Sequence, residues 1–477
     1  MNDVFTLYLT LDKANNITKD NLVRIFGINV IFFVLSLVFF SCTSSPNPYA
    51  QIDKAVSLNE FERGVEEIRL GQEKVWPIYS TRNAISLFLD IGLLQHYAGS
   101  YRSSSQDLQE AERLIEDAFT KSVTAEMASY IINDNTREYP GEDYEDIYIN
   151  VFNALNYYHN NDLEEAMVEV RKITLPNGKL DMLSRKYENS SRSAGDWLMA
   201  QLKSLGFEIN PVLPSGQAVN FTNSALARYL GALFYLGQEN TDSARIEFEQ
   251  LKAAFADNPK IYNFPIPKAA SDAQNVPDGK VRLNIIGFAG LSPLKEERLI
   301  PGFFPFFNNT PLRFIQFKLP VFVERKSVNP VDRIEVAVTG GDIFNLELLE
   351  NMGEVMKETY NARFSNMYFK TYVRTLLKYA AADIAATQAG KESNSSLAAY
   401  GSALAAKIAI DASEGADTRM ARYFPDKAYI GGINLDPGTY TVNITYYSGH
   451  PVIARDKPRD VNVRANELNL IETFFLR

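Results

Sequence analysis

An apolar run near the amino terminus decides where the rest of this chain folds. From Ile25 to Phe40 almost every residue is apolar, and Arg24 stands just before the run. A membrane-spanning helix needs ~20 such residues, so the run is short for that purpose and suits the core of a signal peptide. The chain from Cys42 onward is therefore expected to fold outside the cytoplasm.

The end of this run carries a lipidation signal. Ser41 places a small residue directly before Cys42, which is the only cysteine of the chain. An apolar run closed by a small residue and a cysteine resembles the lipobox of bacterial lipoproteins. The resemblance implies that Cys42 is acylated on its sulphur and becomes the mature amino terminus. The alternative interpretation is an uncleaved anchor with an incidental cysteine.

Residues 1–41 are accordingly assigned to the signal peptide and residues 42–50 to a polar tether. Signal peptides begin close to their positive charge, yet Asp3, Asp12 and Asp20 precede Arg24. This arrangement predicts that translation starts near Val23 and that the start before it is mis-assigned.

The charge balance excludes some partners. The net charge is -10, and the basic residues form no cluster, which argues against nucleic acid and against electrostatic docking on anionic lipid. A single cysteine permits no internal disulfide, so the core is held by packing alone. A chain of 477 residues is expected to form two or three domains.

Residues 51–260 contain three segments that resemble the tetratricopeptide repeat (TPR). In each, a large residue, a small residue and a turn follow one another at the spacing of that motif. The first segment has Phe88, Ile91, Gly92, Gly99, Tyr101, Ser104, Leu108 and Ala111. The second has Ala154, Tyr157, Asn161, Leu163, Ala166, Val170 and Ile173. The third has Leu230, Gly231, Phe234, Ala244, Phe248 and Leu251, with Asp242 as the predicted N-cap.

The spacing has a steric reason. Small residues at Gly92, Ala154 and Gly231 let the two helices of each pair cross closely. Asn161 replaces the usual glycine because asparagine tolerates a left-handed backbone. Any antiparallel helical hairpin needs small residues at its crossing, which is the alternative interpretation. The segments do not recur every ~34 residues, so the prediction is a degenerate TPR-like solenoid with insertions.

A solenoid of this kind presents its concave face to an extended ligand. Four tyrosines on the predicted first helices are the candidate partner-binding residues: Tyr157, Tyr158, Tyr229 and Tyr235. Tyrosines at such positions more often belong to the core than to a contact surface.

The composition changes in a proline-containing stretch, and residues 261–278 are predicted to be a linker before a domain at residues 279–477. Strand-like alternation and alanine-rich helical runs share this domain. The predicted strands are Lys280–Phe288, Arg313–Glu324, Arg333–Thr339, Tyr429–Asn434, Thr439–Tyr447, Arg459–Arg464 and Leu468–Phe475, and the predicted helices are Asn345–Arg363, Met367–Ala389 and Ser395–Ala412. The expected fold class is mainly α: the solenoid, followed by an α+β domain with a small antiparallel sheet.

Residues for catalysis are not apparent. The three histidines, His96, His159 and His450, are scattered, and no common hydrolase or nucleotide-binding motif occurs. We therefore predict no catalytic residue, no cofactor and no metal, with His96 and His159 as ordinary helix residues. Carboxylates are abundant, so the sequence leaves a carboxylate-only hydrolase open.

The order of the parts resembles an uncharacterised family of bacterial lipoproteins. The segments that carry the resemblance are NALNYYHNNDLEEA and the ADTR…FP…LDPGTYTV ending. The family brings no assigned catalytic residue. The first hypothesis is a lipid-anchored scaffold that binds an envelope protein through its TPR-like helices; the second is an envelope glycan-binding protein or hydrolase. Thr43 follows Cys42 where an inner-membrane retention signal has Asp, so the expected location is the outer membrane, facing the periplasm.

Overall fold

The structure is a computed structural model that describes residues 47–75, 77–124, 133–188, 200, 221–304, 313–327, 329–393 and 415–477. Residues Gln51–Arg477 form one unit, and Met1–Ala50 form another. The predicted signal peptide and Cys42 lie outside the described residues.

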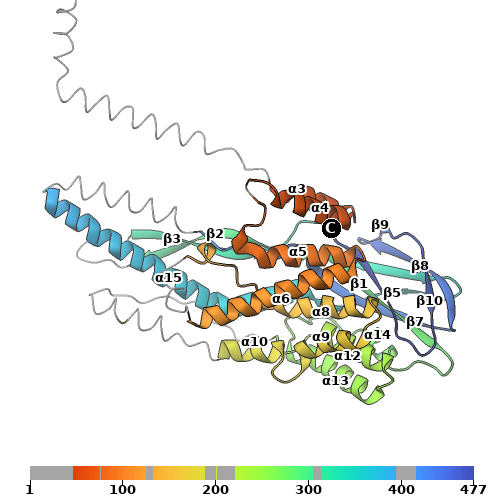
Figure 1. Cartoon of the computed structure of the whole chain (residues 1–477). Helices are drawn as coiled ribbons and strands as arrows, with labels where there is room; N and C mark the ends of the chain where they lie inside the picture. The colour runs from red at the N-terminus through yellow and green to blue at the C-terminus, as the bar shows by residue number, and fades with distance from the viewer. Residues whose placement is uncertain are drawn as a thin grey trace, which may run out of the picture. The chain divides into compact units, whose positions relative to one another are not determined.

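Helices dominate the amino-terminal part of the larger unit (Figure 1). They are α3 (Ala50–Ser57), α4 (Phe61–Gln72), α5 (Ala84–Tyr97), α6 (Tyr101–Thr124), α8 (Asp143–His159), α9 (Leu163–Thr174), α10 (Lys179–Glu188), α12 (Ala225–Gly237), α13 (Thr241–Asp257) and α14 (Lys268–Asp272), with single 3-10 turns η2 (Thr81–Asn83) and η3 (Asp134–Thr136).

The three predicted helical hairpins are present as α5–α6, α8–α9 and α12–α13. A Cβ added to Gly92 would lie 2.8 Å from Leu108, so glycine is required where α5 and α6 cross. Asn161 has the predicted left-handed backbone, with φ at 61°. The N-cap of α13, however, is Asn240, which accepts the N–H of Ser243, so the prediction of Asp242 at this position is wrong.

Strands fill most of the carboxyl-terminal part. They are β1 (Val281–Leu291), β2 (Leu294–Phe304), β3 (Arg313–Val323), β4 (Arg333–Val338), β5 (Ile343–Asn345), β6 (Glu347–Asn351), β7 (Pro425–Leu435), β8 (Gly438–Tyr447), β9 (Val452–Arg455), β10 (Arg459–Val463) and β11 (Asn469–Phe475). The first sheet has the order β11-β1-β7-β6; the second has the order β10-β8-β4-β5, with β9 on β8; and β2 pairs with β3. Within the first sheet, β1 and β11 run parallel.

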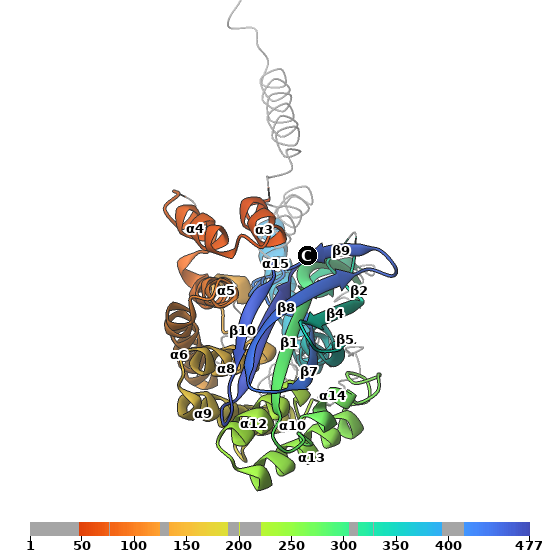
Figure 2. The ribbon, with the colours of Figure 1, turned by 90° about the vertical axis from the view of Figure 1, so that its right-hand side faces the viewer.

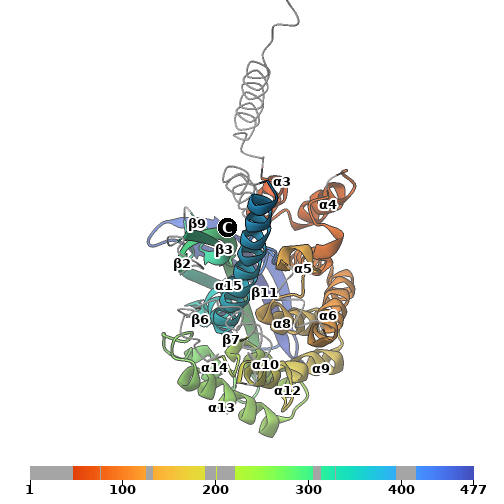
Figure 3. The ribbon, with the colours of Figure 1, turned by 90° about the vertical axis from the view of Figure 1, so that its left-hand side faces the viewer.

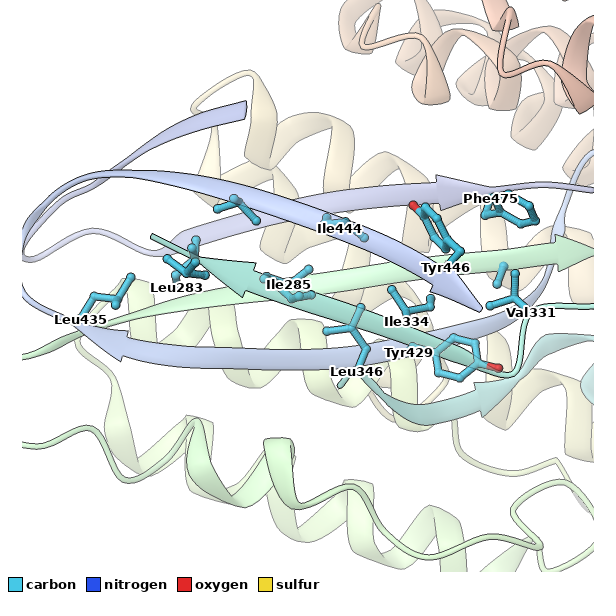
Figure 4. Packing of buried hydrophobic residues seen from close by; sticks show 14 of the residues in the cluster. Leu283, Ile285, Val331, Ile334, Leu346, Tyr429, Leu435, Ile444, Tyr446 and Phe475 are labelled. Atoms are coloured by element: carbon cyan, nitrogen blue, oxygen red, sulfur yellow. The ribbon is translucent and has the colours of Figure 1, made fainter. Parts of the chain in front are cut away.

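The two larger sheets face each other across an apolar core (Figure 4). Leu283 and Ile285 of β1 meet Ile334 of β4 and Ile444 of β8 in this core. Burial of β1 on both of its faces explains its nearly continuous apolar sequence.

The helical hairpins cover the other face of the first sheet. Figure 2 shows the pairs following one another along one side of the strands. Phe152 of α8 packs on Phe288 of β1 with ring centroids 5.4 Å apart, and Phe288 stacks on Phe474 of β11 at 5.8 Å. The unit therefore has three layers: helices, first sheet and second sheet.

This architecture corrects the predicted fold class. The prediction of a mainly α chain with a small antiparallel sheet is wrong, because helices hold 48% and strands 23% of the residues and the first sheet is mixed. The predicted strands lie close to β1, β3, β4, β7, β8, β10 and β11, but β2, β5, β6 and β9 were not expected. The parallel pair joins strands far apart in the sequence, and local alternation contains no information on such pairing.

One long helix, α15 (Met352–Ser393), replaces the first two predicted carboxyl-terminal helices. It packs against β3, β7 and α8 (Figure 3). The predicted helix Ser395–Ala412 lies outside the described residues. Within the described ranges, no helix has the length and hydropathy to cross a membrane.

Candidate functional site: a cleft beside strand β11

A cleft lies between the helix layer and the second sheet, beside β11. Its volume is about 330 Å³, and its walls include Phe61 of α4, Tyr97 of α5, Arg459 of β10 and the β11 segment Ile471–Phe474. It continues along α4, past Glu62, as a second hollow of about 690 Å³. We call both hollows together the edge cleft.

The helix side of the edge cleft is aromatic. The ring of Tyr97 lies 5.5 Å from that of Phe61 and 4.9 Å from that of Phe474. Phe61 and Phe474 are 6.5 Å apart in an edge-to-face arrangement. Such rings offer a rigid apolar surface to a ligand at low entropic cost.

A buried carboxylate between two histidines forms the polar floor of the edge cleft. Glu472 of β11 accepts from His159 Nε2 at 2.6 Å, and its second oxygen lies 3.1 Å from His96 Nε2. The side chains of Glu472 and His96 are almost fully buried, whereas that of His159 is 17% exposed. Tyr101 stacks on the His159 ring at 4.3 Å.

The fold fixes His96 from its other side as well. His96 Nδ1 lies 2.8 Å from Asn156 Oδ1, and Asn156 donates to Ser104 Oγ, which donates to the Gly92 carbonyl. Both ring nitrogens of His96 therefore lie within hydrogen-bond distance of side-chain oxygens. This network joins α5, α6 and α8 to β11.

The carboxylate keeps its charge in this setting. Burial alone would raise the pKa of Glu472, but the charge of His96 and the hydrogen bonds from both histidines outweigh burial and lower the pKa to about 2. A group with so low a pKa is a poor proton donor or acceptor at neutral pH. Glu472 therefore stays ionised on the floor of the edge cleft.

The second-sheet side of the edge cleft is polar. Arg459 donates through Nη2 to the carbonyl of Glu472 at 2.6 Å. Asp456 accepts from Thr473 at 2.5 Å and from Tyr446 at 3.1 Å. Among the described residues, no group of three or more His, Cys, Asp or Glu side chains is arranged to hold a metal ion.

Three further buried carboxylates lie away from the edge cleft and already have donors. Asp90 accepts the backbone N–H groups of Arg422 and Tyr423, and Glu145 accepts that of Ala421. Burial raises the pKa of both carboxyls to about 7. The third, Glu350, accepts hydrogen bonds from three hydroxyl groups and one backbone N–H. Asp90 and Glu145 hold the backbone of residues 421–423 against α5 and α8, and Glu350 joins β6 to α8 and α12. All three have a structural role.

The structure places the four predicted partner-binding tyrosines as follows. Tyr229 is fully buried, and its hydroxyl lies 3.5 Å from Asn284 Oδ1 of β1. Tyr158 donates to the carbonyl of Leu468 at 2.8 Å. Tyr157 and Tyr235 contact neighbouring helices instead: Tyr157 accepts from Gln109, and Arg171 lies 5.7 Å from the Tyr235 ring centre. The four side chains do not meet on one surface.

Sequence reasoning overlooked His96 and His159 as members of a site. One signal was available, because each histidine lies near the end of the first helix of its hairpin, four residues after Gly92 and five after Ala154. Stacked hairpins place such positions at the same end of neighbouring helices. Glu472 gave no comparable signal, because its place beside them depends on pairing between distant segments.

Comparison of the chain with models of known protein families, with curated protein sequences and with solved structures yields no match.

We expect Glu472→Gln to destabilise the protein at pH 6 but hardly at pH 2. A carboxyl with a depressed pKa stabilises the fold above its unfolded pKa, and this contribution is lost as the pH falls from about 4.5 through about 2. At roughly 1.4 kcal/mol per pKa unit, the loss at pH 6 is about 3 kcal/mol. Urea unfolding of the wild type and the variant at both pH values measures it.

Glu467→Gln is the matched control, because the Glu467 side chain is 57% exposed and, among the described residues, forms an ion pair with Arg464 alone. It is expected to leave the free energy of unfolding nearly unchanged at both pH values. Equal destabilisation of Glu472→Gln at pH 6 and pH 2 would contradict the charged state assigned to Glu472.

Proposed function

We propose that this protein is a lipid-anchored cell-envelope protein that binds another envelope protein in the edge cleft. It is anchored through Cys42 and has no catalytic role in this proposal. The observation that carries the proposal is the covering of the three helical hairpins by the first sheet. It leaves the edge cleft as the place where the helix layer and the sheets share an open surface.

The covering of the helical hairpins changes which surface we assign to the partner. A solenoid binds its ligand on the face lined by first helices. Here those helices contact the first sheet: His96 of α5 lies beside Glu472 of β11. Phe152 of α8 packs on Phe288 of β1, and Tyr229 of α12 lies beside Asn284 of β1. The chain's own sheet thus lies where a bound segment would be expected. We therefore assign the partner to the edge cleft instead of the four predicted tyrosines.

The chemistry of the edge cleft supports a protein partner. Protein interfaces combine aromatic anchors with a polar, partly charged rim, and Tyr and Arg are enriched among the residues that dominate binding. The edge cleft has Phe61, Tyr97 and Phe474 on one side and Arg459 on the other. The location at the outer membrane rests on the sequence signals at Cys42 and Thr43.

Site-specific photocrosslinking in intact cells tests this proposal. A photoreactive amino acid replaces Glu62, which is exposed and lines the edge cleft, or Ile246 of α13, which is 52% exposed and lies elsewhere. We expect one discrete protein adduct from position 62 and none of that size from position 246. An adduct from position 246 alone would contradict the assignment, and a peptidoglycan fragment at position 62 would favour the glycan-binding alternative.

A further inference from the structure

Strand β11 is an edge of the first sheet. It pairs with β1 on one side, and within the described ranges no strand pairs with it on the other side. The backbone N–H of Leu470 donates to the Tyr158 hydroxyl at 2.9 Å, and the Glu472 carbonyl accepts from Arg459. The backbone groups of Leu470 and Glu472 therefore point away from β1. Because backbone direction alternates along a strand, those of Phe474 point the same way.

The edge cleft lies where the next strand of this sheet would run. Glu472 and Phe474 face the helices, since they contact His96 and Tyr97. Thr473 faces the second sheet, where it contacts Asp456, and Ile471 packs on the core between the sheets. Residues of both faces line the same hollow. A hollow that touches both faces of a strand lies beside its edge.

Part of this edge is available for pairing. In the described part of the chain, no protein group accepts from the backbone N–H of Glu472 or pairs with the backbone N–H and carbonyl of Phe474 on the outer side. Open strand edges are templates for another strand, and proteins often shield them with charged side chains. Arg459 and Tyr158 shield the rest of this edge.

We propose that an extended segment of the partner protein pairs with β11 in the edge cleft and becomes a fifth strand of the first sheet. This inference rests on the proposed function and specifies how the partner binds. Backbone hydrogen bonds supply affinity in this mode, and the side chains that alternate along the added strand supply specificity. A backbone N–H of the incoming segment replaces Arg459 at the Glu472 carbonyl.

The two walls of the edge cleft define the side chains that such a segment carries. Side chains that point to the helix layer meet the rings of Phe61, Tyr97 and Phe474. Side chains that point to the second sheet meet Arg459, which forms no ion pair with a carboxylate among the described residues. The complementary segment therefore alternates apolar and acidic residues.

Backbone N-methylation of a synthetic peptide tests strand pairing on the unmodified full-length protein in detergent. The probe is a short peptide in which valine and glutamate alternate. Two further versions carry N-methyl groups on alternate backbone amides. In one version these amides lie along one edge of the extended peptide, and in the other they lie along the opposite edge. We expect one version to bind like the parent and the other to bind at least about tenfold more weakly in fluorescence anisotropy. Equal binding of both methylated versions, or no binding of the parent, would overturn the proposal.

A charge reversal tests the role of Arg459. Arg459→Glu is expected to lose the valine–glutamate peptide and to gain a valine–lysine peptide, a gain that an unfolded variant would not show. Arg113→Glu on α6, with a side chain 55% exposed, is the matched control and is expected to bind like the wild type. If position 62 gives the protein adduct but both peptide tests fail, strand addition is overturned and the proposed function stands. If position 62 gives no protein adduct, the proposed function is refuted.

Discussion

Replacing Glu350 with alanine is expected to lower the free energy of unfolding of the unit Gln51–Arg477 by at least about 3 kcal/mol. Glu350 of β6 is fully buried and accepts the hydroxyls of Tyr148 at 2.7 Å, Tyr262 at 2.7 Å and Ser224 at 2.9 Å. It also accepts the N–H of Leu226 at 3.0 Å, in the first turn of α12. Alanine leaves the hydroxyls of Tyr148 and Ser224 and the N–H of Leu226 buried without this acceptor, which costs about 1–3 kcal/mol for each group. The Tyr262 hydroxyl keeps only the long contact of 3.5 Å to the Asn223 carbonyl.

Urea denaturation of Glu350→Ala and of two further variants measures this effect. Glu350→Gln keeps the side-chain volume and one acceptor oxygen, so we expect a smaller loss of about 1–3 kcal/mol. Glu249→Ala removes a carboxylate that is 56% exposed and pairs with Lys252, and it should change stability by less than about 0.5 kcal/mol. Similar effects of Glu350→Ala and Glu249→Ala would show that Glu350 does not join the helices to the first sheet.

Glu350 also shows what the sequence does not reveal. Its donors come from α8, from Ser224 and the first turn of α12, and from Tyr262, all far from β6 in the chain. Burial raises the pKa of this carboxyl, and only the folded arrangement explains why a charge-bearing residue is tolerated there. In the sequence, Glu350 is one of 58 acidic residues and nothing distinguishes it.

Local patterns predicted the elements that depend on local chemistry. The hairpin α5–α6 follows from a small residue at Gly92, because only a small residue permits the crossing with Leu108. The alternation of Val442, Ile444 and Tyr446 predicted β8, and all three side chains point into the core between the sheets. These predictions needed only information from neighbouring residues.

The arrangement of the elements required information that is distant in sequence. The sheet was predicted to be small because each strand was assessed alone, whereas β11 pairs with β1 in parallel after almost the whole domain has intervened. The same pairing places Glu472 between His96 and His159 and creates the edge cleft. The candidate site was therefore not predictable from the spacing of its residues.

Cys42→Ser is expected to abolish lipid labelling of the protein completely. Cys42 is the only cysteine, so no second thiol can take its place. In the lipoproteins that the chain resembles, the lipid is attached to the cysteine sulphur, which serine lacks. Incorporation of radiolabelled palmitate measures the effect. Ser41→Ala keeps a small residue before the cysteine and is the matched control, which we expect to be labelled like the wild type.

The same variant decides whether the lipid is the anchor. Two acyl chains attach a protein stably to a bilayer, whereas electrostatic attachment needs clustered basic residues, which this chain with a net charge of -10 lacks. If the lipid is the anchor, unlabelled Cys42→Ser leaves the membrane fraction on washing with high salt, while Ser41→Ala stays with the outer membrane. An unlabelled variant that remains in the washed membranes would instead indicate that the apolar run Ile25–Phe40 is retained as an uncleaved anchor. Mass spectrometry of the amino-terminal peptide separates the two cases, because cleavage before residue 42 removes that run.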